Sequence, residues 1–243
     1  MPNHSKKMFQ VSTLQALMLG YTKSVISVSE LLKHGDIGLG TFEDVAGEMI
    51  VLDARCYQAK SDGSVCEADK ETGIPFCAVS FMEKQREVEL KNVTGIDQLK
   101  QFLDMSIDEA FSLNSMHIIR VDGLFNKVSA RSVDALKAQH MELKTILEKN
   151  QQTFGFENIK GTLVCIYFPD YMDGINAPGW HLHFISDDRK HGGHVFDINL
   201  QQGTAAFCKI TSIEIKFPET AEFDTYALKE VSKQDIKEIE QGK

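Results

Sequence analysis

Three histidines in the C-terminal third of the chain have the residue type and spacing of a metal site. His181 and His183 are two residues apart, and His194 follows the polar, glycine-containing segment 186–193. Side chains of a β-strand alternate between its two faces, so His181 and His183 are expected to point to the same side. If the chain then turns back, His194 opens the partner strand and reaches the same place. Three neutral imidazoles on a stiff hairpin suit a catalytic zinc ion that keeps an open coordination position.

Two other interpretations of these histidines have to be weighed. His191 competes with His194 for the third ligand position, but it lies in the charged turn, and a ligand belongs on a stiff element. We therefore favour His194. A pair such as His181 and His183 is also compatible with two hydrogen-bonded histidines on an ordinary strand. The third histidine favours the metal site, as do the apolar residues that alternate with the pair and would face the core: Trp180, Leu182 and Phe184.

The rest of the chain must supply the elements that hold such a site. Residues 48–52 and 55–58 flank the short turn Asp53-Ala54 and are typical of a β-hairpin. Residues 116–121 and 124–130 indicate two further strands around Asp122-Gly123. The apolar run 161–168 predicts a strand that is buried on both faces. Together with several amphipathic helical segments, these strands predict a mixed α/β (α+β) fold.

Composition excludes several classes of partner. The 243 residues are 42% apolar and 25% charged, which is ordinary for a globular protein. The formal net charge of −9 argues against nucleic acid, because phosphate binding needs a basic surface. No apolar run approaches the ~20 residues of a membrane span, and the N-terminus has no signal-peptide pattern. The five cysteines are scattered and contain no CxxC motif, so we expect a cytoplasmic protein without a disulfide framework.

At this point the sequence resembles the acetolactate decarboxylase family along nearly its whole length. The matching segments are residues 9–20, 38–41, 47–50, 75–76, 130–131, 160–163, 178–184 and 192–195. The last two segments are specific, because together they fix which residues are the metal ligands, the spacing between those ligands and the turn that joins them. One departure is the segment 132–139, which lacks the prolines that some relatives carry.

The resemblance implies a role for particular residues. The zinc ligands of the family fall on His181, His183 and His194, which agrees with the spacing argument. Its active-site glutamate falls on Glu48 and its active-site arginine on Arg131.

Two further site residues follow from the same resemblance. A threonine near the pocket falls on Thr41. A second glutamate comes from the C-terminal tail and falls on Glu240, although Glu238 is close enough to be an alternative.

The chemistry implied is a zinc-dependent decarboxylation of 2-acetolactate to acetoin and CO2 through a metal-bound enediolate. A divalent metal can act as the electron sink for such a reaction, and other divalent transition ions would also suit three imidazoles. Arg131 would hold the substrate carboxylate. Glu48 or Glu240 would deliver a proton, because burial in a partly apolar pocket raises the pKa of a carboxylic acid toward neutrality.

The resemblance also implies an architecture. Residues 1–158 would form an N-terminal domain with a mixed sheet and flanking helices that pairs across a homodimer. Residues 159–243 would form a smaller, β-rich domain that carries zinc, with its tail over the active site.

Two other functions remain open from the residues alone. A metal-dependent hydrolase using zinc-bound hydroxide would keep the three histidines, and a non-enzymatic metal-binding β protein would need neither Glu48 nor Arg131.

Overall fold

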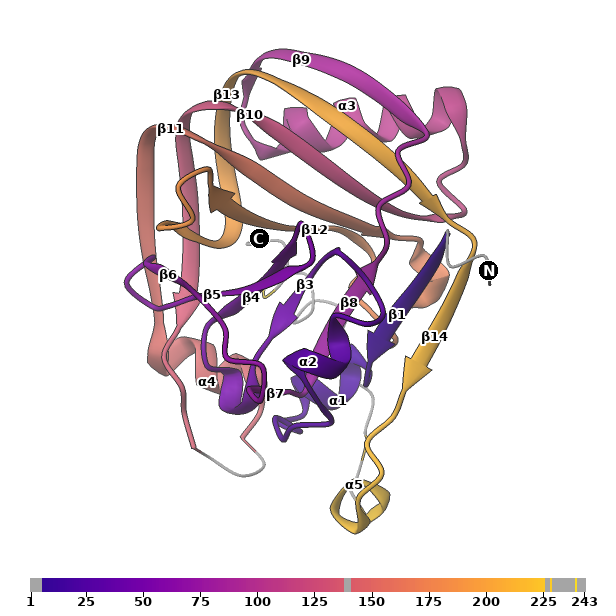
Figure 1. Cartoon of the computed structure of the whole chain (residues 1–243), viewed down its shortest axis with the longest axis vertical. Coiled ribbons are helices and arrows are strands. Elements are labelled where there is room, and N and C mark those ends of the chain that lie inside the picture. The colour runs from indigo at the N-terminus through magenta and orange to yellow at the C-terminus, as the bar shows by residue number, and fades with distance from the viewer. Residues whose placement is uncertain (1–5, 138–140, 226–227, 229–238, 240–243) are drawn as a thin grey trace.

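The first layer of the fold is a seven-stranded mixed sheet. The computed structural model describes residues 6–137, 141–225, 228 and 239. The strand order in this sheet is β14-β1-β8-β3-β4-β5-β6, with β1 and β14 parallel and the other neighbours antiparallel (Figure 1). The strands are β1 (Lys7–Val11), β3 (Ile37–Thr41), β4 (Glu48–Leu52), β5 (Arg55–Ala59), β6 (Val65–Glu67), β8 (Phe76–Ser80) and β14 (Ser212–Lys216).

The second sheet has long strands and closes on itself. Its order is β10-β11-β12-β13-β9, and β13 pairs with β10 as well as with β12. The strands are β9 (Arg86–Thr94), β10 (Met116–Val133), β11 (Gln151–Phe168), β12 (Gly179–Ser186) and β13 (Gly192–Ile210). Helix α3 (Ile96–Ala110) buries Leu99, Leu103 and Ile107, at four-residue spacing, in the core of this sheet.

The remaining elements are short. They are α1 (Leu14–Met18), β2 (Ile26–Ser27), α2 (Val28–Leu31), the 3-10 turn η1 (Glu43–Val45), β7 (Gly73–Ile74), α4 (Leu143–Asn150), the 3-10 turn η2 (Asp170–Met172) and α5 (Ala221–Thr225). Strands β2 and β7 form a separate two-stranded sheet. No helix within the described ranges is both long and apolar enough to cross a membrane.

A shared apolar core joins the two sheets. One face of the first sheet contributes Leu39 and Ile50, which cluster with Val164 and Ile185 of the second sheet. Each sheet is thereby apolar on the face that meets the other, as layered packing requires. Strands β4 and β12 consequently lie against each other, although more than a hundred residues separate them in the chain.

The mixed α+β class expected from the sequence is confirmed, and so are three of the expected strands. The hairpin around Asp53-Ala54 forms, and residues 161–168 are largely buried within β11. The prediction of two strands around Asp122-Gly123 is wrong, because β10 runs unbroken from Met116 to Val133. Gly123 pairs with glycines of β11 and β13, and a Cβ there would lie 2.7 Å from the Gln202 carbonyl oxygen. The glycine therefore serves close strand contact and makes no turn.

The two sheets do not divide the chain at one point. Residue 158, where the sequence suggests a domain boundary, lies inside β11. Strands β9 and β10 precede that residue and belong to the second sheet, whereas β14 follows it and joins the first sheet. The two parts of the chain are thus interleaved.

Candidate metal centre

The three histidines converge because of strand alternation and hairpin register. His181 and His183 lie on one face of β12, and His183 pairs directly with His194 of β13. Their neighbours Trp180 and Phe184 point into the core of the second sheet, as expected. Arg131 of β10 pairs with His194 from the other side, so one residue of β13 joins the histidines to the arginine.

A pair of glycines lets these strands approach closely. A Cβ on Gly192 would lie 2.6 Å from the Phe184 carbonyl oxygen, and one on Gly193 would lie 2.8 Å from the Arg131 carbonyl oxygen. Real side chains do not tolerate such contacts. The glycines before His194 are therefore required for β13 to fit between β12 and β10.

The spacing of the ring nitrogens fits a shared cation. His181 Nε2 lies 3.0 Å from His183 Nε2 and 3.1 Å from His194 Nδ1. Tetrahedral zinc with Zn–N bonds of about 2.0–2.1 Å separates its ligand nitrogens by about 3.3 Å. Among the residues that the structure describes, these three histidines are the group that can hold a metal ion, and all three are buried.

The protonation of the histidines also suits a metal. Burial lowers the pKa of His181 to about 3, and the charges of Arg131 and Lys100 act in the same direction. Burial likewise holds the pKa of His183 well below its usual value. The His183 Nδ1 lies 2.8 Å from the Met49 carbonyl oxygen, to which it donates, so its Nε2 keeps a lone pair for a ligand bond. Both imidazoles are therefore neutral at neutral pH, which is the form that binds metals.

Glu48 and Arg131 lie beside the histidines, although they come from different sheets. The Glu48 Oε2 is 3.4 Å from His183 Nε2, and the Glu48 side chain is 14% exposed. The Arg131 Nη2 is 3.1 Å from His194 Nε2, and Arg131 is buried. Thr41 pairs with Glu48 across β3 and β4, but its hydroxyl donates to the Gly47 carbonyl oxygen at 2.9 Å.

The other candidate site residues lie outside the histidine cluster or outside the described residues. His191 lies outside the cluster, with its side chain 47% exposed and its Nδ1 3.9 Å from an Asp188 carboxylate oxygen. Glu240 and its alternative Glu238 lie outside the described residues. Ile239, between them in sequence, is described and is buried in the same pocket as His181.

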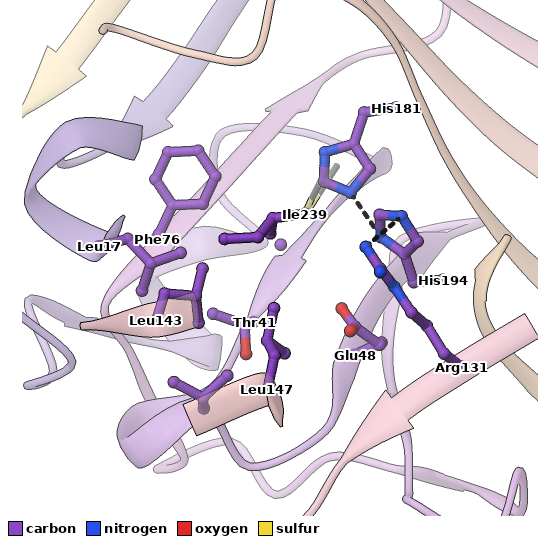
Figure 2. A pocket seen from close by; sticks show the side chains of 12 residues that line it. Leu17, Thr41, Glu48, Phe76, Arg131, Leu143, Leu147, His181, His194 and Ile239 are labelled. Carbon is purple, nitrogen blue, oxygen red and sulfur yellow. Dashed lines mark hydrogen bonds between the residues drawn. The ribbon is translucent and has the colours of Figure 1, made fainter. Parts of the chain in front are cut away.

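The pocket has an apolar wall that the sequence does not reveal. Figure 2 shows His181, His194, Arg131 and Glu48 on one side and Leu17, Phe76, Leu143 and Leu147 on the other. Val45 also lines this pocket. These apolar residues come from several distant elements. In the sequence they look like ordinary core residues, and no local signal marks them as pocket residues.

Comparisons with known proteins agree over nearly the whole chain. The sequence profile of the family "Alpha-acetolactate decarboxylase" matches residues 8–230. An alpha-acetolactate decarboxylase of Methanosarcina mazei is 38% identical over 239 residues, which cover 98% of this chain and 81% of that protein. One of Lactococcus lactis subsp. cremoris is 36% identical, covering 87% and 88%. The crystal structure of the Bacillus subtilis strain 168 enzyme superposes with a TM-score of 0.91 at 31% identity, covering 96% of this chain and 99% of that one.

Proposed function

The chain belongs to the alpha-acetolactate decarboxylase family and is therefore a carboxy-lyase, and we propose that it converts 2-acetolactate to acetoin and CO2 with zinc as cofactor. One observation carries the proposal. Three buried histidines have ligand spacing, and two of them, His181 and His194, line a pocket together with a buried arginine and a glutamate. Decarboxylation of a β-keto acid needs three components: an electron sink, a group that binds the carboxylate and a proton donor.

His181, His183 and His194 would hold the zinc ion. Zinc supplies a Lewis acid that stabilises the negative charge developing on the substrate oxygens as CO2 leaves. The imidazoles add no charge of their own, and burial keeps water away from them. The Met49 carbonyl oxygen fixes the orientation of His183.

Arg131 would bind the substrate carboxylate before it is lost. A guanidinium group presents a planar fork of donors that matches a carboxylate in two places. Its position 3.1 Å from His194 keeps that carboxylate next to the reacting carbon. The group is buried, so solvent does not compete strongly for its donors.

Glu48 would deliver the proton that replaces CO2. It reaches the pocket from the first sheet, whereas the histidines and Arg131 belong to the second, so the enediolate of the substrate would be protonated from one side. Glu240 of the tail is the second candidate, and its neighbour in the sequence, Ile239, lines the pocket. The apolar wall of Leu17, Phe76 and Leu143 would receive the methyl groups and exclude water.

The assay that tests this function uses purified protein and racemic acetolactate, with and without a chelator. We expect acetoin and CO2 to form, to stop after chelation and to resume on adding Zn²⁺. Absence of metal-dependent acetoin formation contradicts the proposal, and hydrolysis of ester substrates in its place would favour a zinc hydrolase.

Truncation of residues 236–243 should cut activity severely if Glu240 takes part. The homodimer implied by the resemblance is tested by light scattering of the same sample.

A further inference from the structure

Val45 has a backbone conformation that suits its side chain poorly. Its φ is 56°, and among the described residues it is the only β-branched one with a left-handed backbone. Such a residue is a genuine conformational outlier, because the branched Cβ crowds the backbone. Asp44 before it has a φ of 58° and Gly47 after it one of 81°. The turn that leads into β4 therefore contains three left-handed residues within four positions.

Contacts from other segments hold the first half of this turn. The Asp44 amide donates to the Thr22 carbonyl oxygen at 3.0 Å, and the Leu136 amide donates to the Asp44 carbonyl oxygen at 3.1 Å. The Lys23 ammonium lies 3.1 Å from the Asp44 carboxylate. Asp44 is thus fixed by two distant parts of the chain, which can maintain a strained neighbour.

The second half of the turn is held from the first sheet. The Gln58 side-chain amide donates to the Ala46 carbonyl oxygen at 2.6 Å. The Thr41 hydroxyl donates to the Gly47 carbonyl oxygen at 2.9 Å. Glu48 follows immediately, so hydrogen bonds to both halves of the turn fix the backbone direction with which the chain enters β4.

The turn delivers two side chains to the pocket. Val45 is 4% exposed and packs in a cluster with Phe76 and Leu143. Glu48, three residues later, places its Oε2 3.4 Å from His183 Nε2. A relaxed turn would still allow β4 to pair, but it would leave the start of the strand, and therefore the Glu48 side chain, less well directed.

We propose that the left-handed backbone of Val45 positions Glu48 for proton delivery, which makes Val45 a positioning residue. This inference rests on the proposed decarboxylase function. The unfavourable conformation is maintained because packing of the Val45 side chain and the bonds to Asp44 and Ala46 together specify it. Strain kept at a pocket is typical of a site whose geometry must be fixed before the substrate binds.

Two substitutions separate the backbone from the side chain. Val45→Ala and Val45→Gly both remove the pocket contact, but only glycine frees the backbone. We expect Val45→Gly to have a kcat about tenfold below that of Val45→Ala, with KM unchanged. Its acetoin should have lower enantiomeric purity, because water then competes with Glu48. The Tm of Val45→Gly should equal or exceed that of Val45→Ala, because alanine keeps the left-handed strain.

The control and a second variant complete the experiment. Ala54→Gly makes the same change of backbone freedom at the other end of β4, where φ is 59°, and should leave kcat and enantiomeric purity unchanged. Gln58→Met keeps every pocket side chain but removes the donor to the Ala46 carbonyl oxygen, and should lower both quantities. Equal values in Val45→Ala and Val45→Gly, or wild-type values in Gln58→Met, would overturn the inference. A wild-type protein that forms no acetoin would instead overturn the proposed function, and the order of Tm values would still report the strain.

Discussion

Strand β4 connects two turns that share a backbone conformation and differ in their surroundings. Asp44 and Val45 before the strand have φ values of 58° and 56°, and Asp53 and Ala54 after it have values of 54° and 59°. The second turn is a two-residue hairpin loop, whose tight geometry requires positive φ at both residues. Asp53 tolerates that conformation well. The first turn, residues 42–47, is a longer connection between the antiparallel strands β3 and β4, and its length does not require positive φ at the valine.

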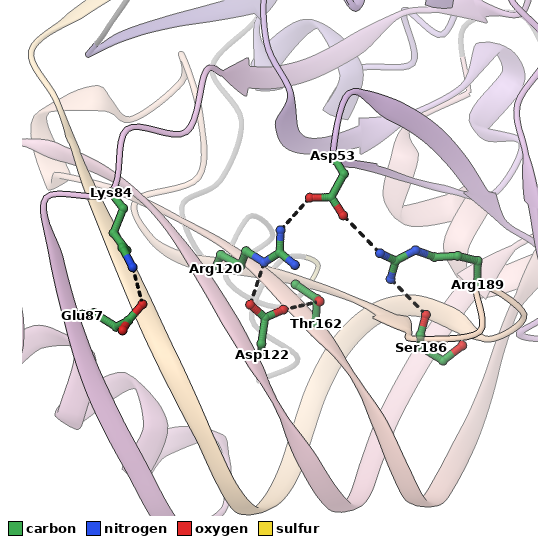
Figure 3. A network of polar contacts seen from close by, with 8 residues as sticks. All are labelled: Asp53, Lys84, Glu87, Arg120, Asp122, Thr162, Ser186 and Arg189. Carbon is green, nitrogen blue, oxygen red and sulfur yellow. Dashed lines mark hydrogen bonds and ion pairs between the residues drawn. The ribbon is translucent and has the colours of Figure 1, made fainter.

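The polar contacts at the two ends differ as well. Asp53 is 54% exposed and pairs with Arg120 at 2.6 Å and Arg189 at 3.2 Å (Figure 3). Exposed ion pairs of this kind contribute about 0–1 kcal/mol each, and salt screens them. Glu48 at the other end lies against His183, which is fully buried. The same strand thus ends in a solvated network on one side and in a pocket on the other.

This contrast extends to the strands that surround β4. Strand β10 carries Arg120 in the exposed network and Arg131 in the pocket. The β12–β13 hairpin has the half-exposed His191 in its turn and His194 in the pocket. Glu48, Arg131 and His194 in the pocket therefore each have a counterpart of similar chemistry at the surface end of the same element. If function resides at the pocket end alone, matched substitutions at the two ends will have very different effects.

The largest difference is expected between His183→Ala and His191→Ala. Removal of His183 deletes one of three ligands from a fully buried site, so we expect no stoichiometric zinc and no measurable turnover. His191 is half-exposed in the hairpin turn, and its variant should keep both zinc and activity. Metal analysis of the purified proteins and the acetoin assay measure the two outcomes. Loss of zinc in His191→Ala would show that the turn also supplies a ligand.

Arg131→Ala and Arg120→Ala form the second pair, on strand β10. The pocket variant should lose about 10³-fold in kcat/KM while keeping its zinc, because a buried donor to the substrate carboxylate is removed. Arg120→Ala should change kcat/KM less than about twofold, since its partners Asp53 and Asp122 are solvated. Zinc content and kinetics on the same samples decide between the roles. A variant at Arg131 that loses the metal would make this arginine a structural support of the histidines.

Glu48→Gln is expected to have the next largest effect. Glutamine keeps the shape of the side chain but cannot deliver an acidic proton, so kcat should fall by about 10²-fold and acetoin should lose enantiomeric purity. Glu240→Gln is the matched test of the other candidate. Whichever variant racemises the product identifies the donor, and unchanged enantiomeric purity in both would exclude a glutamate from that step.

Local patterns predicted the histidine hairpin, because strand alternation and a glycine-containing turn are properties of neighbouring residues. His181 and His183 had to share a face, and the pairing of His183 with His194 followed from the turn. The same reasoning failed at Gly123, since a glycine within a strand signals a turn or a close contact, and the sequence alone does not distinguish them.

The turn before β4 could not be predicted for a different reason. No propensity places valine in a left-handed conformation, so every local rule argues against the observed backbone of Val45. The contacts that impose it come from Leu136 and Gln58, which are distant in sequence. Residues that contradict their local preference are expected at functional sites, where tertiary contacts override it.

Asp53→Asn is expected to have the smallest effect, and it makes at the end of β4 the same kind of change that Glu48→Gln makes at its start. Asparagine tolerates the left-handed backbone as well as aspartate does, so the hairpin turn should persist. The negative charge that pairs with Arg120 and Arg189 is lost. We expect the free energy of unfolding to fall by less than about 1 kcal/mol, and by less still at high ionic strength. Urea denaturation at two salt concentrations measures this, and kcat should stay within about twofold of wild type because no network residue lines the pocket. A loss of kcat as large as that of Glu48→Gln would mean that the exposed network also positions the pocket residues, since β4 would then transmit the change from one end to the other.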